Sequence, residues 1–368
     1  AWMHVVQLKK NYSNNINISH HIFFSSKGHD SPGLYSVLLG LGKLEFSLIH
    51  KLRRLGGLPG HPDVGTPNIV TNTGSLGMGI SKAKGMIIAN RLQQKKGNVY
   101  VLTGDGELQE GQFWESLASA VNNNFFELTV IIDHNKLQSD TLVSKVSDLG
   151  DLEAKLNAFG WHVIRCDGNN LSDFSRSLEE AGEVVDKPKI IIADTIKGKG
   201  VSFMEHTSID SDVELYKYHS GAPSGDAYIR ASQELIDDIN TKLESNGLDR
   251  VELESIDRPV ANIPSSPERL VAAYTESLLK EARNNPDIVA LDADLILDTG
   301  LIPFQTSNPD KFIECGIAEQ DMVSQAGGMA LRGLLPIVHS FACFLTARPS
   351  EQIYNNCTEH TKIIYVGT

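Results

Sequence analysis

Residues 98–107 of the sequence read NVYVLTGDGE, and residues 128–137 read LTVIIDHNKL. In each segment a run of mostly apolar residues ends in a short polar stretch that contains an aspartate. Continuous apolar runs are typical of strands that are buried on both faces, as in parallel sheets covered by helices on both sides. The two segments therefore predict two strands of such a sheet, each with polar residues at its carboxyl end.

The alternation of strand and helix extends over residues 74–205. We expect strands at 98–103, 128–133, 161–165 and 190–195, and helices at 74–96, 112–123, 152–159 and 171–182. This order predicts an α/β domain with an open, doubly wound, mostly parallel sheet.

A second series follows a looser, polar stretch. Residues 206–264 contain Pro259 and Pro264 and one expected helix at 226–245, so we interpret them as a linker. Residues 265–368 predict a second doubly wound sheet, with strands at 288–292, 311–313, 335–339 and 362–366 and helices at 266–284, 318–332 and 348–359. Because the chain stops just after the last of these strands, we expect the second domain to be truncated.

The composition excludes several classes of protein. The chain has 368 residues, of which 41% are hydrophobic and 21% charged, and this balance excludes an intrinsically disordered chain. Its net charge of −13 argues against nucleic acid as a partner, since nucleic-acid-binding surfaces are usually basic. No apolar run approaches the roughly 18–20 residues of a membrane-spanning helix, so we expect no membrane partner.

The cysteines and the start of the chain add two expectations. The four cysteines show no C-x-x-C spacing, which is typical of reduced thiols and favours a cytoplasmic location. The sequence begins Ala-Trp-Met-His, without an initiator methionine or a signal-peptide pattern, in what we expect to be an amphipathic helix. We therefore expect the 368 residues to be a fragment, a split subunit or an incompletely represented chain.

Oxygen ligands for a metal follow the two strands quoted first. Asp105 offers a carboxylate, Asn135 an amide carbonyl and Leu137 a backbone carbonyl, all beyond the carboxyl ends of strands, where open α/β sheets bind ligands. Three hard oxygen donors fit Mg²⁺ or Ca²⁺, with ligand phosphates and water completing the coordination. Gly104 and Gly106 have no Cβ and would let phosphates approach the backbone.

At this point the sequence resembles a known family. The pattern GDG-x₂₈-N, with 28 residues between Gly106 and Asn135, is similar to the diphosphate-and-metal motif of thiamine-diphosphate enzymes. Further segments look like transketolases: SKGH at 26–29, GHP at 60–62, TGSLG at 73–77, GDGELQEGQFWE at 104–115, AFGW at 158–161, KGKGVSFME at 197–205, Tyr218-His219, DADL at 292–295 and GIAEQ at 316–320. The resemblance runs from about residue 23 to 366, with the motifs in the same order as in the family.

The resemblance implies a division into domains and a cofactor site. Residues 1–205 would be the diphosphate- and metal-binding domain, 206–264 a linker, and 265–368 an incomplete pyrimidine-binding domain. Thiamine diphosphate and Mg²⁺ (or Ca²⁺) would be the cofactors, with Asp105, Asn135 and the Leu137 carbonyl holding the metal. The family's cofactor contacts carry over to Gly74, Leu76, Gly104, Asp105, Gly106, Asn135, Asp294, Glu319, Phe341 and Phe344, the last two being the aromatic residues of HSFACF at 339–344.

The resemblance also implies catalytic residues. Glu319 would hydrogen-bond the ring nitrogen of the aminopyrimidine, a role that favours a protonated carboxyl in an apolar setting. His29, His61 and His219 match positions that contact the donor's hydroxyl groups or relay protons, work that suits imidazole because its pKa lies near neutrality.

Two parts of the family pattern are missing. The 368 residues contain no Ser-Gly-His segment before SKGH and no counterpart of the family's third domain, so we expect a separate polypeptide or unrepresented residues to complete the fold. Cofactor sites in the family form between two subunits, so the resemblance implies a homodimer, either alone or with a separate subunit that supplies the C-terminal part. A degenerate, inactive relative is the other interpretation.

The resemblance implies transfer of a two-carbon ketol unit from a ketose phosphate to an aldose or aldose phosphate, with sugar phosphates as substrates. Two alternatives stay open. The first keeps the cofactor but changes the chemistry, as in a 1-deoxyxylulose-5-phosphate synthase or a 2-oxo acid decarboxylating component. The second is a non-catalytic transketolase-like subunit.

Overall fold

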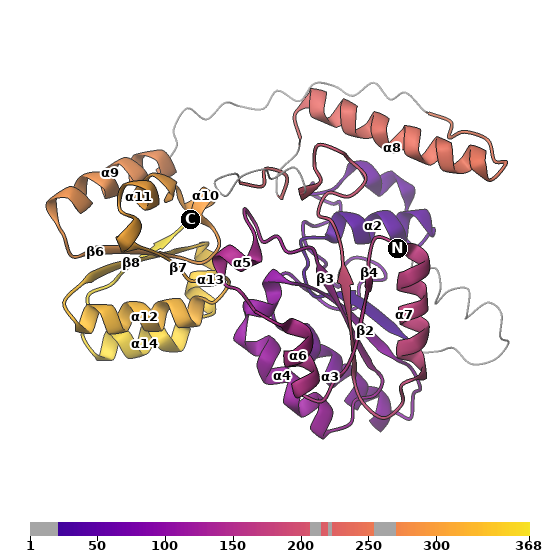
Figure 1. Ribbon diagram of the computed structural model, residues 1–368, viewed down its shortest axis with the longest axis horizontal. Coiled ribbons are helices and arrows are strands. Elements are labelled where there is room, and N and C mark those ends of the chain that lie inside the picture. The colour runs from indigo at the N-terminus through magenta and orange to yellow at the C-terminus, as the bar shows by residue number, and fades with distance from the viewer. Residues whose placement is uncertain (1–20, 207–214, 220–222, 254–269) are drawn as a thin grey trace. The chain divides into compact units, whose positions relative to one another are not determined.

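The structure is a computed structural model, and it describes residues 21–206, 215–219, 223–253 and 270–368 (Figure 1). The helix expected at the start of the chain and the first residues of the helix expected at 266–284 lie outside these ranges. The chain divides into two compact units, which are described separately: unit 1 comprises Ala1–Lys136 and Asp148–Thr195, and unit 2 comprises Leu137–Ser147 and Ile196–Thr368.

Unit 1 contains a five-stranded parallel sheet in the order β1-β2-β3-β5-β4. Its strands are β1 (Ile22–Ser25), β2 (Val99–Gly104), β3 (Leu128–His134), β4 (His162–Asp167) and β5 (Lys189–Asp194). The four predicted strands are confirmed, and β1 was not predicted because its four residues are too few to show a pattern. β1 is parallel to β2, with Ile22 opposite Val99 and Ser25 opposite Leu102. The SKGH segment, which follows β1, therefore lies at the carboxyl edge of the sheet.

Helices cover both faces of this sheet, as Figure 1 shows for α3 (Gly79–Leu92), α4 (Gly111–Asn122) and α6 (Leu152–Ala158) on one side and α7 (Leu171–Glu183) on the other. In β3, Val130 and Ile132 join the core cluster that includes residues of α3, α4 and α6, whereas Ile131 joins the cluster that includes Ala181 of α7. Neighbouring strand residues thus face opposite helical layers, which explains the continuous apolar runs. The helices of this unit are α2 (Ser31–Gly40), η1 (Phe46–His50), α3 (Gly79–Leu92), η2 (Gly106–Gln109), α4 (Gly111–Asn122), α6 (Leu152–Ala158) and α7 (Leu171–Glu183).

One predicted helix begins later than expected. The helix predicted from residue 74 begins at Gly79, because Gly74 (φ 123°) and Gly77 (φ 82°) adopt left-handed backbone conformations that end regular helix. Residues 74–78 therefore form a loop before α3.

Unit 2 contains a four-stranded parallel sheet in the order β7-β6-β8-β9. Its strands are β6 (Ile288–Asp292), β7 (Phe312–Glu314), β8 (Leu335–Ser340) and β9 (Ile364–Gly367). Its helices are α5 (Val143–Val146), α8 (Gly225–Ser245), α9 (Leu270–Asn284), α10 (Ile296–Thr299), α11 (Ile302–Ser307), η4 (Pro309–Lys311), α12 (Glu319–Leu331), α13 (Ala342–Ala347) and α14 (Ser350–Thr358). The expected strands and the helices near 226–245, 318–332 and 348–359 are present, and two all-parallel sheets confirm the predicted fold class.

Unit 2 also has a core on each face of its sheet. Leu291 and Val338 pack with Met322 of α12 on one face, and Ala290 and Ile337 lie in a separate cluster with residues of α9 and α11 on the other. No helix in the described part of the chain is both long enough and apolar enough to cross a membrane.

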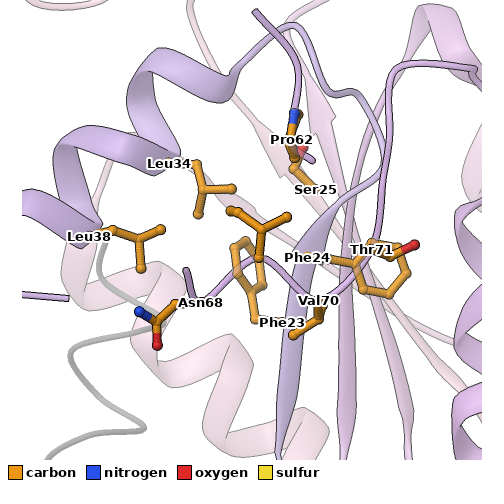
Figure 2. A pocket seen from close by; sticks show the side chains of 10 residues that line it. Phe23, Phe24, Ser25, Leu34, Leu38, Pro62, Asn68, Val70 and Thr71 are labelled. Carbon is orange, nitrogen blue, oxygen red and sulfur yellow. The ribbon is translucent and has the colours of Figure 1, made fainter. Parts of the chain in front are cut away.

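A small cavity lies between β1, α2 and residues 62–71 of unit 1. Figure 2 shows Phe23 and Phe24 from β1 and Leu34 and Leu38 from α2 around it, and Val70 lines it too. It has room for about one water molecule and contains no predicted site residue. It is a gap in the packing and far too small for a cofactor.

The buried His339 of β8 should make the stability of unit 2 depend on pH. Its side chain is 0% exposed, with Nδ1 3.0 Å from the Leu291 carbonyl oxygen and Nε2 2.6 Å from the Tyr274 hydroxyl. Burial lowers the pKa of His339 to about 4. The unfolded chain, with an ordinary histidine pKa of about 6.5, binds more protons between these two values, so stability falls as the pH decreases through this window.

We expect the free energy of unfolding of unit 2 to fall by about 2 kcal/mol between pH 7 and pH 5 through His339 alone. Urea unfolding at both pH values measures how much the free energy of unfolding changes between pH 7 and pH 5. The change in the wild type minus the change in His339→Gln is the contribution of His339. The exposed His360 provides a control, since His360→Gln should keep the wild-type dependence. Equal pH dependence in wild type and His339→Gln would contradict a neutral buried imidazole.

Candidate active site

Four strand ends come together at the carboxyl edge of unit 1. Because β1, β2, β3 and β5 are neighbours in one parallel sheet, the segments that follow them share this edge. The motifs SKGH, GDGE and DHN lie there, followed by Thr195 after β5. The predicted diphosphate- and metal-binding residues of unit 1 therefore lie where ligands bind in open α/β sheets.

Asp105 is the buried carboxylate of this edge, with 3% exposure. Its Oδ1 accepts a 2.9 Å hydrogen bond from the Gly106 amide, and its Oδ2 accepts one from the amide of Lys136, next to Asn135. Burial, with a smaller contribution from Asp133, raises the pKa of Asp105 to about 6, although the two amides and His134 counteract the rise. The structure thus ties the GDG loop to the segment after β3.

The donor set fits a hard divalent cation. Asn135 is buried and directly precedes Lys136, whose amide binds Asp105. Lys136 has a left-handed backbone conformation (φ 66°), which turns the chain before Leu137. Leu137 is buried too and is assigned to unit 2. Among the described residues no group of three or more His, Cys, Asp or Glu side chains is arranged to hold a metal. A cation held by one carboxylate, one amide and one backbone carbonyl would need ligand phosphates and water to complete its coordination.

Glu107 is a central residue of the site that the sequence analysis missed. It is 3% exposed, accepts hydrogen bonds at Oε1 from Ser26 Oγ and from the Gly77 amide at 2.9 Å, and receives the Gly104 amide at Oε2 at 3.3 Å. One side chain thereby joins the SKGH, TGSLG and GDG segments. Burial raises the pKa of Glu107, although these hydrogen bonds and Lys27 oppose the rise. The three loops lie far apart in the sequence, so the hydrogen-bond acceptor that they share could be identified only in the folded structure.

Close backbone contacts join the histidine segments. A Cβ on Gly28 (φ 71°) would lie 2.6 Å from the Cα of Gly74, and a Cβ on Gly74 would lie 2.8 Å from Cδ2 of His61. Glycine is therefore required where SKGH, TGSLG and GHP meet. His29 and His61 are both exposed at this junction. Partial loss of solvation, together with the charge of Arg53, lowers the pKa of His61. Leu76 of the TGSLG loop is half-buried.

Lys27 places a cation among the carboxylates of the edge. Its Nζ donates to Asp133 Oδ2, and the Thr195 hydroxyl donates to Asp133 Oδ1. A Cβ on Gly104 would lie 3.2 Å from Lys27 Cδ, so the lysine stem covers the GDG loop. Burial alone would raise the pKa of Asp133, but Lys27 and hydrogen bonds from Thr195 and Asn135 lower it below its ordinary value.

We expect Lys27→Met to destabilise unit 1 by about 2–4 kcal/mol, because it leaves a poorly solvated carboxylate without its cation. The Lys27 side chain is 10% exposed and that of Asp133 25% exposed, so the loss should be smaller than for a fully buried pair. Urea unfolding of Lys27→Met, Asp133→Asn and the double variant forms a thermodynamic cycle, with the exposed Lys96→Met as control. Strictly additive losses would contradict a coupled pair.

In unit 2, the predicted pyrimidine-side residues gather around Glu319, the first residue of α12. Glu319 is 2% exposed, and its two oxygens lie 2.8 and 2.9 Å from Nη1 of Arg348. The Arg348 guanidinium lies 4.2 Å from the ring centroid of Phe344, which is 5.7 Å from the ring of Phe341. The structure thus brings Glu319, Phe341 and Phe344 together with an arginine.

The expected apolar setting of Glu319 is wrong. Arg348 follows α13 directly, packs on Phe344 and carries its guanidinium to the start of α12. The two Glu319 oxygens therefore face a guanidinium, so the setting of this carboxyl group is polar and charged where an apolar one was expected. The physical reason is that Arg348 comes directly after α13, the helix that carries Phe344, and its long side chain lies over the Phe344 ring.

Asp294 and His219 complete the predicted set in unit 2. Asp294 is buried with φ 60°, and its Oδ2 accepts a 3.2 Å hydrogen bond from the Ser139 amide. Burial raises the pKa of Asp294 to about 7. Nδ1 of His219 lies 2.8 Å from Nζ of Lys197, which also donates to the Gln138 carbonyl at 2.6 Å.

The predicted residues thus divide between the units. Unit 1 holds His29, His61, Gly74, Leu76, Gly104, Asp105, Gly106 and Asn135, and unit 2 holds Leu137, His219, Asp294, Glu319, Phe341 and Phe344. In unit 1, His29, Gly104, Asp105, Gly106 and Asn135 lie at or just after the ends of strands, whereas His61, Gly74 and Leu76 lie between η1 and α3.

Comparison with known proteins identifies two domain families along the chain. Residues 2–235 match the thiamine diphosphate binding domain of transketolase, and residues 269–368 match the pyrimidine binding domain of transketolase. Human transketolase is 33% identical over 361 residues, covering 92% of this chain and 56% of the human protein. The chain thus spans about half the length of the full transketolases it matches.

Two further likenesses are informative. A 6-deoxy-6-sulfo-D-fructose transketolase subunit from Clostridium sp. (strain MSTE9) is 41% identical over 192 residues, which cover 52% of this chain and 70% of that subunit. A crystal structure of transketolase from Campylobacter jejuni superposes with a TM-score of 0.50 at 22% identity, covering 94% of this chain and 60% of that one, and this likeness supports the fold. With both domain families matched over most of its length, the chain belongs to the transketolase family of thiamine-diphosphate-dependent enzymes.

Proposed function

We propose that the protein transfers a two-carbon ketol unit from a ketose phosphate to an aldose or aldose phosphate, using thiamine diphosphate and Mg²⁺. The observation that carries this proposal is the pairing, in one chain of this family, of an intact Asp105–Asn135 edge with Glu319 beside Phe341 and Phe344. The first group offers a metal and diphosphate site, and the second offers a carboxyl group and aromatic rings for the aminopyrimidine.

Each part of the site then has a task. Asp105, Asn135 and the Leu137 carbonyl would hold Mg²⁺ against the diphosphate, while the loops containing Gly74, Leu76, Gly104 and Gly106 admit the phosphates. When bound, thiamine diphosphate supplies the carbon nucleophile that attacks the donor's carbonyl group and stabilises the charge left by C–C cleavage.

The remaining residues manage protons and orientation. Glu319 would hold a proton at the ring nitrogen of the aminopyrimidine, and Phe341 and Phe344 would stack on that ring. His29, His61 and His219 would contact the donor's hydroxyl groups and move protons to and from them, as imidazoles do near neutral pH. Arg348 would keep the Glu319 carboxyl in place.

We extend the proposal to domains and partners. Residues 1–205 would bind the diphosphate and metal, residues 206–264 would form the linker, and residues 265–368 would bind the pyrimidine. The protein would act as a homodimer, alone or with a separate subunit. Support for the second arrangement comes from relatives named as subunits, such as an apulose-4-phosphate transketolase subunit of Phocaeicola vulgatus, 34% identical over 227 residues.

We also propose a cytoplasmic location. It is supported by the four free thiols among the described residues, those of Cys166, Cys315, Cys343 and Cys357.

Calorimetric titration tests the proposal. The natural full-length polypeptide, with any subunit that copurifies with it, should bind thiamine diphosphate only when Mg²⁺ or Ca²⁺ is present. Turnover of a ketose phosphate with an aldose phosphate should follow. Pyruvate consumption in place of ketose phosphate turnover would favour the synthase or decarboxylase alternative, and cofactor binding without any turnover would favour the non-catalytic subunit. Absence of cofactor binding would reject the proposal.

A further inference from the structure

Glu314, the last residue of β7, makes an unusual pair of contacts in unit 2. Its Oε1 accepts hydrogen bonds from the Asp294 amide and from the Gly316 amide, both at 2.9 Å. Asp294 lies in the loop after β6, and Gly316 lies in the loop after β7. β6 and β7 are neighbours in the sheet, with Asp292 opposite Glu314. A single carboxyl oxygen therefore joins the loops that leave two adjacent strands.

Both amide donors belong to residues in left-handed backbone conformations, at φ 60° for Asp294 and φ 72° for Gly316. Outside glycine this conformation is uncommon, and an aspartate that adopts it is usually held by local hydrogen bonds. The Glu314 carboxyl supplies that restraint, and Asp292 adds to it by accepting from the Leu295 amide at 2.6 Å. The conformation of residues 292–295 thus depends on the side chain of the neighbouring strand.

The second loop leads directly to Glu319. The Ala318 amide donates to the Gly316 carbonyl at 2.7 Å, which closes a tight turn, and α12 begins at Glu319. Fixing Gly316 therefore fixes where the helix begins and where its first carboxyl group lies. The other loop carries Asp294, so the restraint acts on both acidic residues assigned to the pyrimidine side.

The chemistry of the Glu314 side chain agrees with the role of an acceptor. Burial and the nearby Asp292 raise the pKa of Glu314 above its ordinary value, which favours the neutral acid. The carbonyl oxygen of a neutral carboxyl group still accepts two amide hydrogens. A glutamine has the same shape and the same carbonyl oxygen, so the contact requires the acceptor and not the charge.

We propose that Glu314 is a positioning residue that holds the loops after β6 and β7 in the arrangement that receives the aminopyrimidine of the cofactor. This inference rests on the proposed function, because Asp294 and Glu319 are the groups that it places. It assigns Glu314 no contact with the cofactor itself.

The test compares Glu314→Ala, Glu314→Gln and the control Asp310→Ala, which removes an exposed carboxylate nearby. Two probes are titrated by calorimetry in the presence of Mg²⁺: thiamine diphosphate, which reaches the pyrimidine side, and inorganic diphosphate, which needs only the Asp105–Asn135 edge. Glu314→Ala should bind thiamine diphosphate on the order of 10-fold or more weakly, as is usual when a supporting residue is removed, and should bind inorganic diphosphate as the wild type does. Glu314→Gln and Asp310→Ala should match the wild type with both probes.

Amide hydrogen exchange of the ligand-free protein gives an independent measurement. The amides of Asp294 and Gly316 should exchange faster in Glu314→Ala and at wild-type rates in Glu314→Gln. Glu314→Asp, which shortens the side chain by one methylene, replaces the alanine variant if that variant does not fold. Equal loss of both probes, or unchanged affinity and exchange in Glu314→Ala, would overturn the inference alone. Failure of the wild type to bind thiamine diphosphate would overturn it together with the proposed function.

Discussion

Replacing Asp105 with alanine should abolish the Mg²⁺-dependent binding of thiamine diphosphate. Asp105 is the charged member of the proposed metal site, and it also binds the amides of Gly106 and Lys136. Mutating an outer-sphere partner of a metal site costs about 10–100-fold in affinity, so removing a direct ligand should cost on the order of 100-fold or more. Calorimetric titration with thiamine diphosphate, at fixed Mg²⁺ and without Mg²⁺, measures this loss.

Asp105→Asn separates charge from loop geometry. The asparagine oxygen can accept from only one of the Gly106 and Lys136 amides, so Asp105→Asn should keep one of the two bonds that hold the GDG loop while the cation loses its carboxylate. Asp186→Ala, which removes an exposed carboxylate on the same unit, should bind the cofactor normally. Wild-type affinity in Asp105→Ala would place the metal site elsewhere in the protein.

Glu319→Gln should remove most of the turnover while largely sparing cofactor affinity. A positioned acid or base contributes about 10²–10⁴-fold to rate, and we expect kcat to fall within that range. Glutamine keeps the volume of the buried side chain and an oxygen that faces Arg348, which limits damage to the fold. Replacement by alanine would leave the Arg348 cation, whose side chain is only 11% exposed, without its partner.

Steady-state turnover of a ketose phosphate, together with thiamine diphosphate titration, measures the two effects separately. The exposed Glu351→Gln on α14 is the matched control and should behave as the wild type in both assays. Unchanged turnover in Glu319→Gln would remove Glu319 from the mechanism, and loss of cofactor binding as large as the loss of turnover would assign it to binding instead.

All strands of the two sheets except β1 were predictable, because a strand that is buried on both faces consists of consecutive apolar residues. Val130, Ile131 and Ile132 are apolar without alternation since each faces a helical layer. β1 has only four residues, too few to show such a run. The loop at residues 74–78 could not be distinguished from the helix that follows it, because its small residues are also compatible with a helix.

The site residues were predictable to the extent that their chemistry is local. Asp105 and Asn135 each follow an apolar strand, so their place at one edge follows from the parallel sheet. Glu107, Lys27 and Arg348 were different: their partners are Gly77, Asp133 and Glu319, which lie 30, 106 and 29 residues away in the chain. No pattern of neighbouring residues specifies such a pair.

Local order along the chain was thus enough to define the two α/β sheets, their parallel strands and the polar residues at the strand ends, because hydrophobic burial and glycine conformation act on short segments. Tertiary packing alone decided the environment of those residues. It placed a guanidinium beside Glu319 where an apolar setting was expected, and it gave Glu314 two amide donors from separate loops. Electrostatic and hydrogen-bonding partners depend on distance in space, which only the packing of helices against the sheets determines.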